Sequence, residues 1–577
     1  MKKKLLPALI VTGLIILVVI IMGITALINK YTPTKKTEDL KEYFNISSDD
    51  EVALIVNNEL SDYKAKIIDK KIYVDYKFVH DSLNSRFYWD ANENVLLYTT
   101  ASDIISAAAD SNSYSVTKQT NDFDYPIVKA TSDSALIALD YVKQYSNITF
   151  KSYDDPARIV ITSKWDEIDS ATVSKSTQVR VKGGIKSPIL KEVKKDDKIT
   201  ILDSGDKWDK VATEDGVIGY IKRKALSESK KTKLTNPDYE EETFTHIKKD
   251  KDICLAWNQV TSQSANSKVP QVISSTKGIN VMSPTWFYLN DNNGNLADIA
   301  SKDYVSYCHS QGIEVWGLFS NLENTDVDAA YVLTHTSTRT TLINQIMSAA
   351  FNYELDGVNI DFENITEAAY GDSYIEFIRE LSIKCHNNGI SLSVDVTVPA
   401  SFNKFFNRSD MAKFADYIVI MGYDEHYKGS DAGSVSSIPW VTEGVESTLK
   451  EVPADQIILG MPFYTRIWEL TPKEDDDAVT DTEDQSKYTV ASQVYSMDAA
   501  AAQLATNNAT AALDEESGQN YAEWSASNKL YKVWLEDSTS LEKRLKLVDD
   551  NKLAGAAFWK LGFENSSVWD TVIKYLD

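Results

Sequence analysis

The sequence predicts an α/β protein whose largest part, residues 246–577, is a (β/α)8 TIM barrel. Over these residues, eight apolar strand-like runs alternate with helical stretches. One of these runs has polar side chains at every second position, as expected of a strand that lines a polar site on one face. Ahead of the barrel, two shorter segments and one long apolar run predict an α+β module, a small all-β barrel and one transmembrane helix.

The composition of the 577-residue chain supports packed domains and excludes several classes of function. The hydrophobic fraction of 43% is enough to form cores, which excludes a wholly disordered chain. The formal net charge of −25 argues against nucleic acid as a partner, because neutralising phosphates requires clustered Lys and Arg. Three cysteines and six histidines at scattered positions predict no disulfide framework, no metal centre and no cofactor.

Residues 1–30 predict a cytoplasmic stub followed by a membrane anchor. Three lysines precede an uncharged apolar run, residues 5–28, which is longer than the about 20 residues that cross the hydrocarbon core. The basic residues before the run favour an N-terminus inside the cell and place the bulk of the chain outside. No small-residue cleavage site follows the run, so an anchor is favoured over a signal peptide, whose removal would give a secreted protein.

Residues 37–165 predict an α+β module with a weak internal repeat. Each copy has strands around one helix, with turns rich in Asn and Asp between them. The first copy begins at Lys71 and the second at Pro126. This pattern resembles the small module named after the N-terminal domain of copper amine oxidases. The resemblance implies a structural or wall-associating role, and no copper, because His80 is the one histidine of the segment.

Residues 169–228 predict a small all-β barrel of short alternating strands joined by turns rich in Asp and Gly. The strand order, with Gly219 and Tyr220 in the last strand, resembles a bacterial SH3-like domain. The resemblance implies a module that binds the cell wall, and a rigid spacer is the alternative. A linker rich in Lys, Ser and Glu is expected from there to about residue 245.

The eight predicted barrel strands are Ile253–Trp257, Gly278–Met282, Glu314–Phe319, Gly357–Phe362, Ser391–Val398, Tyr417–Met421, Ile457–Met461 and Gly555–Trp559. The fourth strand departs from the apolar rule. Its apolar residues share one face, towards the helices, whereas Asn359, Asp361 and Glu363 share the other face, inside the barrel. Like-charge proximity is expected to raise the pKa of one carboxyl group, giving an acid that stays protonated near neutral pH.

The segment 356–363, D-G-V-N-I-D-F-E, resembles the D-G-x-D-x-D-x-E signature of glycoside hydrolase family 18. The resemblance implies that Glu363 is the general acid and that Asp361 orients the acetamido group of the substrate. Asp356 and Asn359 are predicted to contact the substrate. This family cleaves β-linked N-acetylglucosamine with the substrate's own acetamido oxygen as nucleophile, so it is an exception to the two-carboxylate scheme.

The sixth and eighth strands resemble further parts of the same family. Met421, Tyr423 and Asp424 resemble its M-x-Y-D/N strand. The resemblance implies that Tyr423 hydrogen-bonds the acetamido oxygen and that Asp424 contacts the sugar. Trp559 resembles the residue that forms the floor under the sugar at the cleavage point.

A stretch after the seventh strand resembles the family's G-x-P-x-Y-G-R-x-W, with Thr465 in place of the usual Gly. Tyr464 and Arg466 of this stretch are predicted to bind substrate. Asn359 is a departure from the family pattern, because many chitinases have Asp there, which shares a proton with the next Asp. Asp361 must then share its proton with Glu363 or with another neighbour. The same form resembles the branch that includes spore cortex-lytic N-acetylglucosaminidases.

Residues 469 to about 528 form an acidic, Ala-rich insertion, predicted as a solvated loop or a small lid subdomain. A calcium site at Asp475–Asp477 is an alternative, although the spacing lacks the EF-hand pattern. For the whole chain, two classes of function remain open. One is an exported, membrane-anchored hydrolase of peptidoglycan, or of chitin, that retains anomeric configuration. The other is a glycan-binding surface protein without catalysis, which the presence of Glu363, Asp361 and Tyr423 disfavours.

Overall fold

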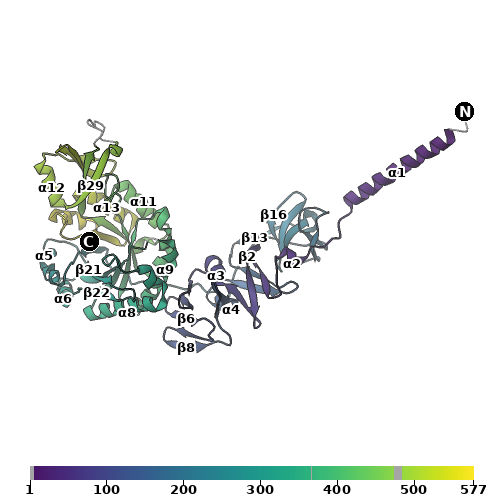
Figure 1. Cartoon of the computed structure of the whole chain (residues 1–577), viewed down its shortest axis with the longest axis horizontal. Coiled ribbons are helices and arrows are strands. Elements are labelled where there is room, and N and C mark those ends of the chain that lie inside the picture. The colour runs from purple at the N-terminus through teal and green to yellow at the C-terminus, as the bar shows by residue number, and fades with distance from the viewer. Residues whose placement is uncertain (1–4, 366, 474–483, 577) are drawn as a thin grey trace. The chain divides into compact units, whose positions relative to one another are not determined.

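The computed structural model describes residues 5–365, 367–473 and 484–576 (Figure 1). The chain divides into two compact units. Unit 1 comprises Met1–Trp89, Ala107–Tyr114 and Asp122–Glu241, and unit 2 comprises Asp90–Ser106, Ser115–Asn121 and Glu242–Asp577. Residues 90–106 and 115–121, which belong to the predicted α+β module, are therefore part of unit 2.

Helix α1 (Leu5–Tyr31) begins the described chain and is drawn in purple in Figure 1. Its segment Pro7–Tyr31 has a mean hydropathy of 2.9 and none of it is buried. Among the described residues, it is the one helix long and apolar enough to cross a membrane. Signal sequences can be equally long and apolar, so length and composition fit both an anchor and a signal sequence for α1.

Unit 1 holds two seven-stranded sheets. The first has the strand order β11-β12-β1-β2-β3-β10-β9, in which β1 and β12 are parallel. Its strands and helices are β1 (Glu51–Val56), β2 (Glu59–Ile68), β3 (Lys71–Asp75), α3 (Tyr76–Ser82), β9 (Val128–Ala130), β10 (Ala135–Ala138), α4 (Leu139–Gln144), β11 (Thr149–Tyr153) and β12 (Arg158–Thr162). In both copies of the repeat, a strand leads directly into a short helix.

The second sheet has the order β15-β14-β18-β17-β16-β13-β19. Its strands are β13 (Glu167–Thr172), β14 (Thr177–Arg180), β15 (Ile189–Val193), β16 (Lys198–Asp203), β17 (Trp208–Thr213), β18 (Ile218–Lys222) and β19 (Lys230–Lys233). Strand β19 pairs with β13 where the sequence predicts a linker. All four of its residues are exposed, so no apolar alternation marked it as a strand.

A further five-stranded sheet follows chain order. It consists of β4 (Phe87–Asp90), β5 (Val95–Thr99), β6 (Ile104–Ala108), β7 (Ser113–Val116) and β8 (Gln119–Asp122).

Unit 2 contains the predicted TIM barrel. Eight parallel strands pair in the order β20-β33-β27-β26-β25-β24-β23-β21, and pairing of β20 with β21 closes the sheet. They are β20 (Ile253–Asn258), β21 (Val281–Leu289), β23 (Glu314–Ser320), β24 (Gly357–Asp361), β25 (Ser391–Thr397), β26 (Tyr417–Met421), β27 (Ile457–Pro462) and β33 (Gly555–Trp559). A short strand, β22 (Leu296–Asp298), pairs antiparallel with the end of β21.

The second barrel strand lies later in the chain than predicted. The prediction began it at Gly278, but this residue has a φ of +77° and lies in a bend before the strand, which begins at Val281. The strand instead continues through Ser283 and Pro284, which interrupt the apolar run in the sequence. The other predicted barrel strands agree with the structure to within two residues at each end.

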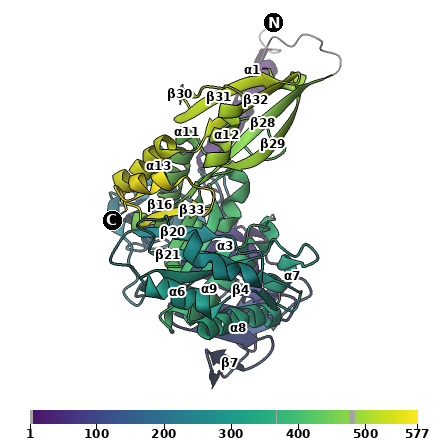
Figure 2. The same cartoon turned by 90° about the vertical axis from the view of Figure 1, so that its left-hand side faces the viewer.

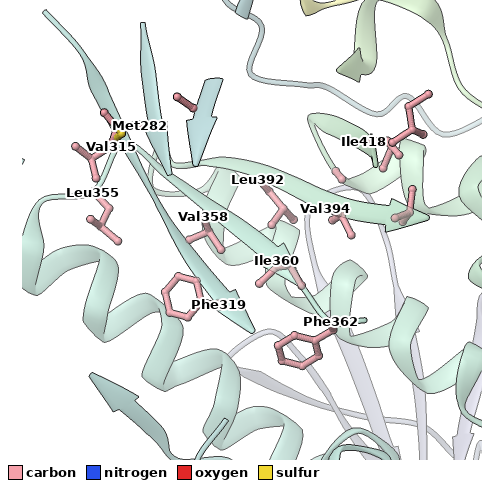
Figure 3. Close-up of a cluster of buried hydrophobic side chains, with 14 of the residues drawn as sticks. Met282, Val315, Phe319, Leu355, Val358, Ile360, Phe362, Leu392, Val394 and Ile418 are labelled. Atoms are coloured by element: carbon pink, nitrogen blue, oxygen red, sulfur yellow. The ribbon is translucent and has the colours of Figure 1, made fainter. Parts of the chain in front are cut away.

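The helices of the barrel pack on the outer, apolar face of the strands. They include α6 (Lys302–Ser310), α8 (Thr336–Tyr353), α9 (Gly371–His386), α11 (Ile438–Thr448) and α13 (Ser538–Asn551). Val358, Ile360 and Phe362 lie in the apolar cluster on this face, together with Leu392 and Val394 of the next strand (Figure 3). The predicted alternation of the fourth strand is therefore confirmed, and its polar residues face the barrel interior.

The insertion after the seventh barrel strand is a folded subdomain (Figure 2). A five-stranded antiparallel sheet, in the order β29-β28-β32-β31-β30, packs with helix α12. Its elements are β28 (Tyr464–Pro472), β29 (Tyr488–Ser496), α12 (Met497–Thr506), β30 (Ala512–Asp514), β31 (Gln519–Ala526) and β32 (Lys529–Leu535). The alternative of a solvated loop is therefore wrong for the described part. Asp475–Asp477 lie outside the described residues.

A buried ion pair joins this subdomain to the helices of the barrel. Arg544 of α13 pairs with Glu536, which follows β32, and both side chains are almost completely buried. Arg544 also donates to the carbonyl oxygen of Ser436, just before α11. The backbone N–H of Glu536 donates to the hydroxyl of Thr465 in β28 at 2.8 Å.

Candidate active site

Asn359 lies at the centre of a hydrogen-bond network inside the barrel and is fully buried. Its Oδ1 accepts hydrogen bonds from Trp257 Nε1 at 3.0 Å and Ser283 Oγ at 2.9 Å. Its Nδ2 donates to Ser393 Oγ at 3.0 Å and to Asp395 Oδ1 at 2.7 Å. Strands β20, β21 and β25 thus hold the amide from three sides, and both its donors and its acceptor are satisfied.

Asp361 ends β24 and is half-buried, with Oδ1 shielded from solvent and without a hydrogen-bond partner. Burial is the largest cause that raises the pKa of Asp361 well above its ordinary value, and the charges of Asp395 and Glu363 raise it further. Glu323, after β23, adds a smaller effect of the same sign. The site therefore favours a protonated carboxyl group at this depth.

Glu363 follows β24 and is exposed at the mouth of the barrel. Partial desolvation raises its pKa, and the negative charges of Asp424 and Glu323 contribute in the same direction. Because the side chain is exposed, solvent screens part of this effect. A carboxylic acid that keeps its proton and remains accessible has the properties of a general acid.

Aromatic rings from three strands line the same end of the barrel. The ring centroid of Trp257 lies 6.4 Å from that of Tyr423 and 5.9 Å from that of Trp559, both in edge-on geometry. Tyr423 and Trp559 are half-buried, so part of each remains accessible. Burial, reinforced by the charge of Glu363, raises the pKa of Tyr423 well above 10, so its hydroxyl remains a hydrogen-bond donor.

A second polar group forms around Asp424, after β26. The hydroxyl of Tyr464 donates to Asp424 Oδ1, and Nη2 of Arg466 lies 3.7 Å from the same oxygen. Tyr464 and Arg466 are both buried, whereas Asp424 is exposed. Because its buried side is held by Tyr464 and Arg466, the Asp424 carboxylate can accept hydrogen bonds from sugar hydroxyls on its exposed side.

The structure brings Met421 to this end of the barrel but not Asp356. Met421 ends β26 and lies beside Gly460, near the end of β27. Asp356 precedes β24, at the opposite end of the strands. Its Oδ2 lies 2.8 Å from His309 Nε2 and accepts a 2.8 Å hydrogen bond from the N–H of Val315. This placement does not support a substrate contact for Asp356 and assigns it to the packing of the barrel's other end.

The sequence prediction missed Asp395 as well as Trp257 and Ser283. The signal for Asp395 was present, because β25 reads Ser-Leu-Ser-Val-Asp-Val-Thr with polar residues at every second position. This is the alternation that identified the fourth strand. Trp257 and Ser283 carried no such signal, since Trp257 lies at the end of an apolar run and Ser283 is a single polar residue that interrupts one.

Among the residues that the structure describes, no group of three or more His, Cys, Asp and Glu side chains is arranged to hold a metal ion. The arrangement suits acid–base chemistry on a sugar. It combines an accessible acid, a deeper carboxyl group two residues earlier, a phenol donor and an aromatic floor. These groups lie at the carboxyl ends of barrel strands, where TIM barrels carry their active sites.

Comparison with known proteins finds matches over the barrel domain. Residues 323–564 match the model of the Glycosyl hydrolases family 18. An "Uncharacterized glycosylase YvbX" of Bacillus subtilis is 24% identical over 49% of this chain and 81% of its own length. The "Cortical fragment-lytic enzyme" of the same species is 25% identical over 48% of this chain and 63% of its own length. The matches thus cover about half of this chain.

Among solved structures, the spore cortex-lytic enzyme of Bacillus cereus superposes with a TM-score of 0.50 and 19% identity. The superposition covers 57% of this chain and 76% of that one. At this identity the likeness concerns the fold, and it agrees with the eight-stranded barrel of unit 2.

Proposed function

We propose that residues 323–564, which match the model of the Glycosyl hydrolases family 18, form a domain of that family, and that the protein cleaves β-linked N-acetylglucosamine in peptidoglycan. In this proposal the protein is exported, is held at the membrane by α1, and works with retention of anomeric configuration. The observation that carries the proposal is the placement of Glu363 and Asp361 on one strand end, beside the hydroxyl of Tyr423.

The first step uses Glu363 as acid and the substrate as its own nucleophile. Glu363 donates its proton to the glycosidic oxygen while the acetamido oxygen bonds to the anomeric carbon, and the glycosidic bond breaks. Asp361 accepts the acetamido N–H and stabilises the positive charge of the resulting oxazolinium ion. Tyr423 donates a hydrogen bond to the acetamido oxygen and holds it in line with the anomeric carbon.

The second step returns the enzyme to its starting state. Glu363, now a carboxylate, takes a proton from a water molecule that attacks the anomeric carbon from the side the leaving group vacated. Two displacements on one carbon restore the original configuration, hence retention. In both steps Trp559 provides the floor under the sugar, and Asp424, Asn359, Met421, Tyr464 and Arg466 form or support the binding surface.

Peptidoglycan is proposed as the substrate because of where the chain is expected to act and what its relatives are called. Relatives in Bacillus subtilis, Bacillus anthracis and Bacillus cereus are named cortical fragment-lytic enzymes, and the apolar helix α1 suits an anchor at the cell surface. The segment 169–228, as an SH3-like module, would hold the enzyme on the wall. Chitin is the second candidate substrate, since a relative in Dictyostelium discoideum is named a probable di-N-acetylchitobiase.

The test compares the full chain, purified in detergent, on peptidoglycan, de-N-acetylated peptidoglycan and chitin. We expect new N-acetylglucosamine reducing ends from peptidoglycan and none from the deacetylated wall, because deacetylation removes the nucleophile. Proton NMR during the reaction should show the β-anomer first. Cleavage of chitin but not of peptidoglycan would assign chitin as the substrate instead. Cleavage of neither glycan would refute the proposal.

A further inference from the structure

Asp395 is a buried carboxyl group inside the barrel that neither the family signature nor the reaction described above uses. Asp395 is 3% exposed. It lies on β25, the neighbour of strand β24, which leads to Asp361 and Glu363. One of its oxygens, Oδ1, accepts the 2.7 Å hydrogen bond from Asn359 Nδ2. A carboxylate this deep is costly unless it is paired or protonated.

The register of the two strands places Asp395 beside Asp361. Asn359 pairs with Ser393 and Ile360 with Val394, so Asp361 and Asp395 are the next residues along their strands. Both side chains face the interior, because Asn359 and Asp361 share one face of β24 and Asp395 reaches Asn359. Two carboxyl groups therefore stand side by side at one level of the barrel.

Asn359 cannot take part in proton exchange between them. Its amide already has partners on both its oxygen and its nitrogen. It donates to Asp395 Oδ1, which leaves Asp395 Oδ2 as the oxygen able to carry a proton. Asp361 Oδ1 is buried and has no partner, so it lacks the hydrogen bond that a proton on Asp395 would supply.

The charged groups that raise the pKa values of the pair are all carboxylates. Asp361 is acted on by Asp395, Glu363 and Glu323, and Asp395 by Glu363. The neighbouring phenols of Tyr374 and Tyr423 respond to the same carboxylates, and burial raises both of their pKa values well above 10. Burial raises the pKa of Asp395 well above its ordinary value, against the opposing effect of the Asn359 hydrogen bond. Burial and like charge therefore both favour a shared proton on the pair over two negative charges.

We propose that Asp395 is the proton partner of Asp361 and acts through it as a positioning residue of the reaction. The inference rests on the proposed function. In the resting enzyme the two carboxyl groups share one proton. When the acetamido N–H reaches Asp361, the proton moves to Asp395, and Asp361 becomes the anionic acceptor that the oxazolinium ion requires. The proton returns after water has attacked, so no proton is gained or lost over the cycle.

Two substitutions of Asp395 separate this role from a simple charge effect. In Asp395→Leu, Asp361 loses its partner and remains buried, so it holds its proton to higher pH. We expect the low-pH side of the kcat–pH profile, the acid limb, to shift to higher pH by about one unit or more. We also expect kcat to be about 100-fold lower. In Asp395→Asn, the amide donates to Asp361 as the protonated partner does, so the acid limb should lie at or below that of the wild type.

Ser393→Ala is the matched control, because it removes another partner of Asn359 and leaves both carboxyl groups in place. We expect it to leave the position of the acid limb unchanged. Thermal unfolding of every variant shows whether the fold is retained. If Asp395→Leu moves the acid limb down together with Asp395→Asn, Asp395 acts only as a charge. If neither substitution moves it, the role is purely structural. Either result overturns the proposal.

Infrared spectroscopy tests the shared proton without any substrate. The wild-type minus Asp395→Asn difference spectrum at pH 7 should contain the C=O band of one protonated carboxyl group, and the wild-type minus Ser393→Ala spectrum should not. Absence of the band would overturn the proposal. If the full chain cleaves no glycan but the band is present, the proposed function fails while the proton pair stands.

Discussion

The hydroxyl of Tyr423 offers the most direct test of how the barrel mouth acts on a substrate. In Tyr423→Phe the ring should stay in place, because Trp257 and Tyr464 hold it edge-on at centroid distances of 6.4 and 6.3 Å. The substitution therefore removes one donor and leaves the surrounding packing intact. If Tyr423 holds the acetamido oxygen in line with the anomeric carbon, its loss affects the transition state more than the bound ground state.

The expected magnitude follows from the environment of the hydroxyl. Burial raises the pKa of Tyr423 well above 10, so the phenol is a fully protonated donor. Removing one such preorganised donor from a site of developing charge costs about 100- to 1,000-fold in kcat, or about 3–4 kcal/mol. The KM should change by no more than a few fold, and the melting temperature by about 2 °C or less.

Tyr464→Phe is the matched control, since its hydroxyl donates to Asp424 rather than to the predicted position of the acetamido group. We expect its main effect on KM, because Asp424 contacts the sugar. The assay measures kcat and KM on peptidoglycan fragments and on a chromogenic N-acetylglucosaminide. A kcat of Tyr423→Phe within about threefold of the wild type would refute the assigned role of the hydroxyl.

Three further substitutions test other parts of the structure. Glu363→Gln should lower kcat on the natural glycan by about 100- to 10,000-fold, and much less on a 4-nitrophenyl glycoside, whose leaving group needs no acid. Because the pKa of Glu363 is raised and the acid must be protonated, wild-type activity should fall as pH rises through that pKa, which a kcat profile measures. Trp559→Ala should raise KM about tenfold, equivalent to about 1.4 kcal/mol, and an unchanged KM would exclude Trp559 as the sugar floor. Arg544→Met leaves Glu536 buried without its partner and should lower the free energy of unfolding by about 3–5 kcal/mol in urea denaturation, whereas the exposed Lys546→Met should change it by less than about 0.5 kcal/mol.

Much of the barrel could be predicted because its strands are short, apolar and regularly spaced. Strands β26 and β33 have the predicted bounds, and the alternation of β24 correctly divides its residues between the helices and the interior. The prediction failed where a strand departs from the apolar rule. Strand β21 continues through Ser283 and Pro284, and the exposed strand β19 consists of Lys and Thr alone.

The folded insertion and the position of Asp356, at the opposite end of β24 from the active site, show a different limit of prediction from sequence. The acidic composition of residues 469–528 left a solvated loop and a small lid subdomain open. The structure agrees with a folded subdomain, because β28, β31 and β32 pair with one another, which no single run reveals. Asp356 matched the family signature as well as Glu363 did. The signature gives the order of residues along a strand, whereas the two ends of that strand lie at opposite ends of the barrel.

The Asn359 departure is best understood in three dimensions rather than along the motif. The interior of a parallel barrel is built in layers to which neighbouring strands contribute side chains at the same height. A carboxyl group beside Asp361 can therefore come from two residues earlier on β24 or from the matching position on β25. This chain has an amide at the first position and Asp395 at the second, joined by a 2.7 Å hydrogen bond. Because the two positions meet inside the barrel, a signature that covers one strand does not determine how many carboxyl groups surround Asp361.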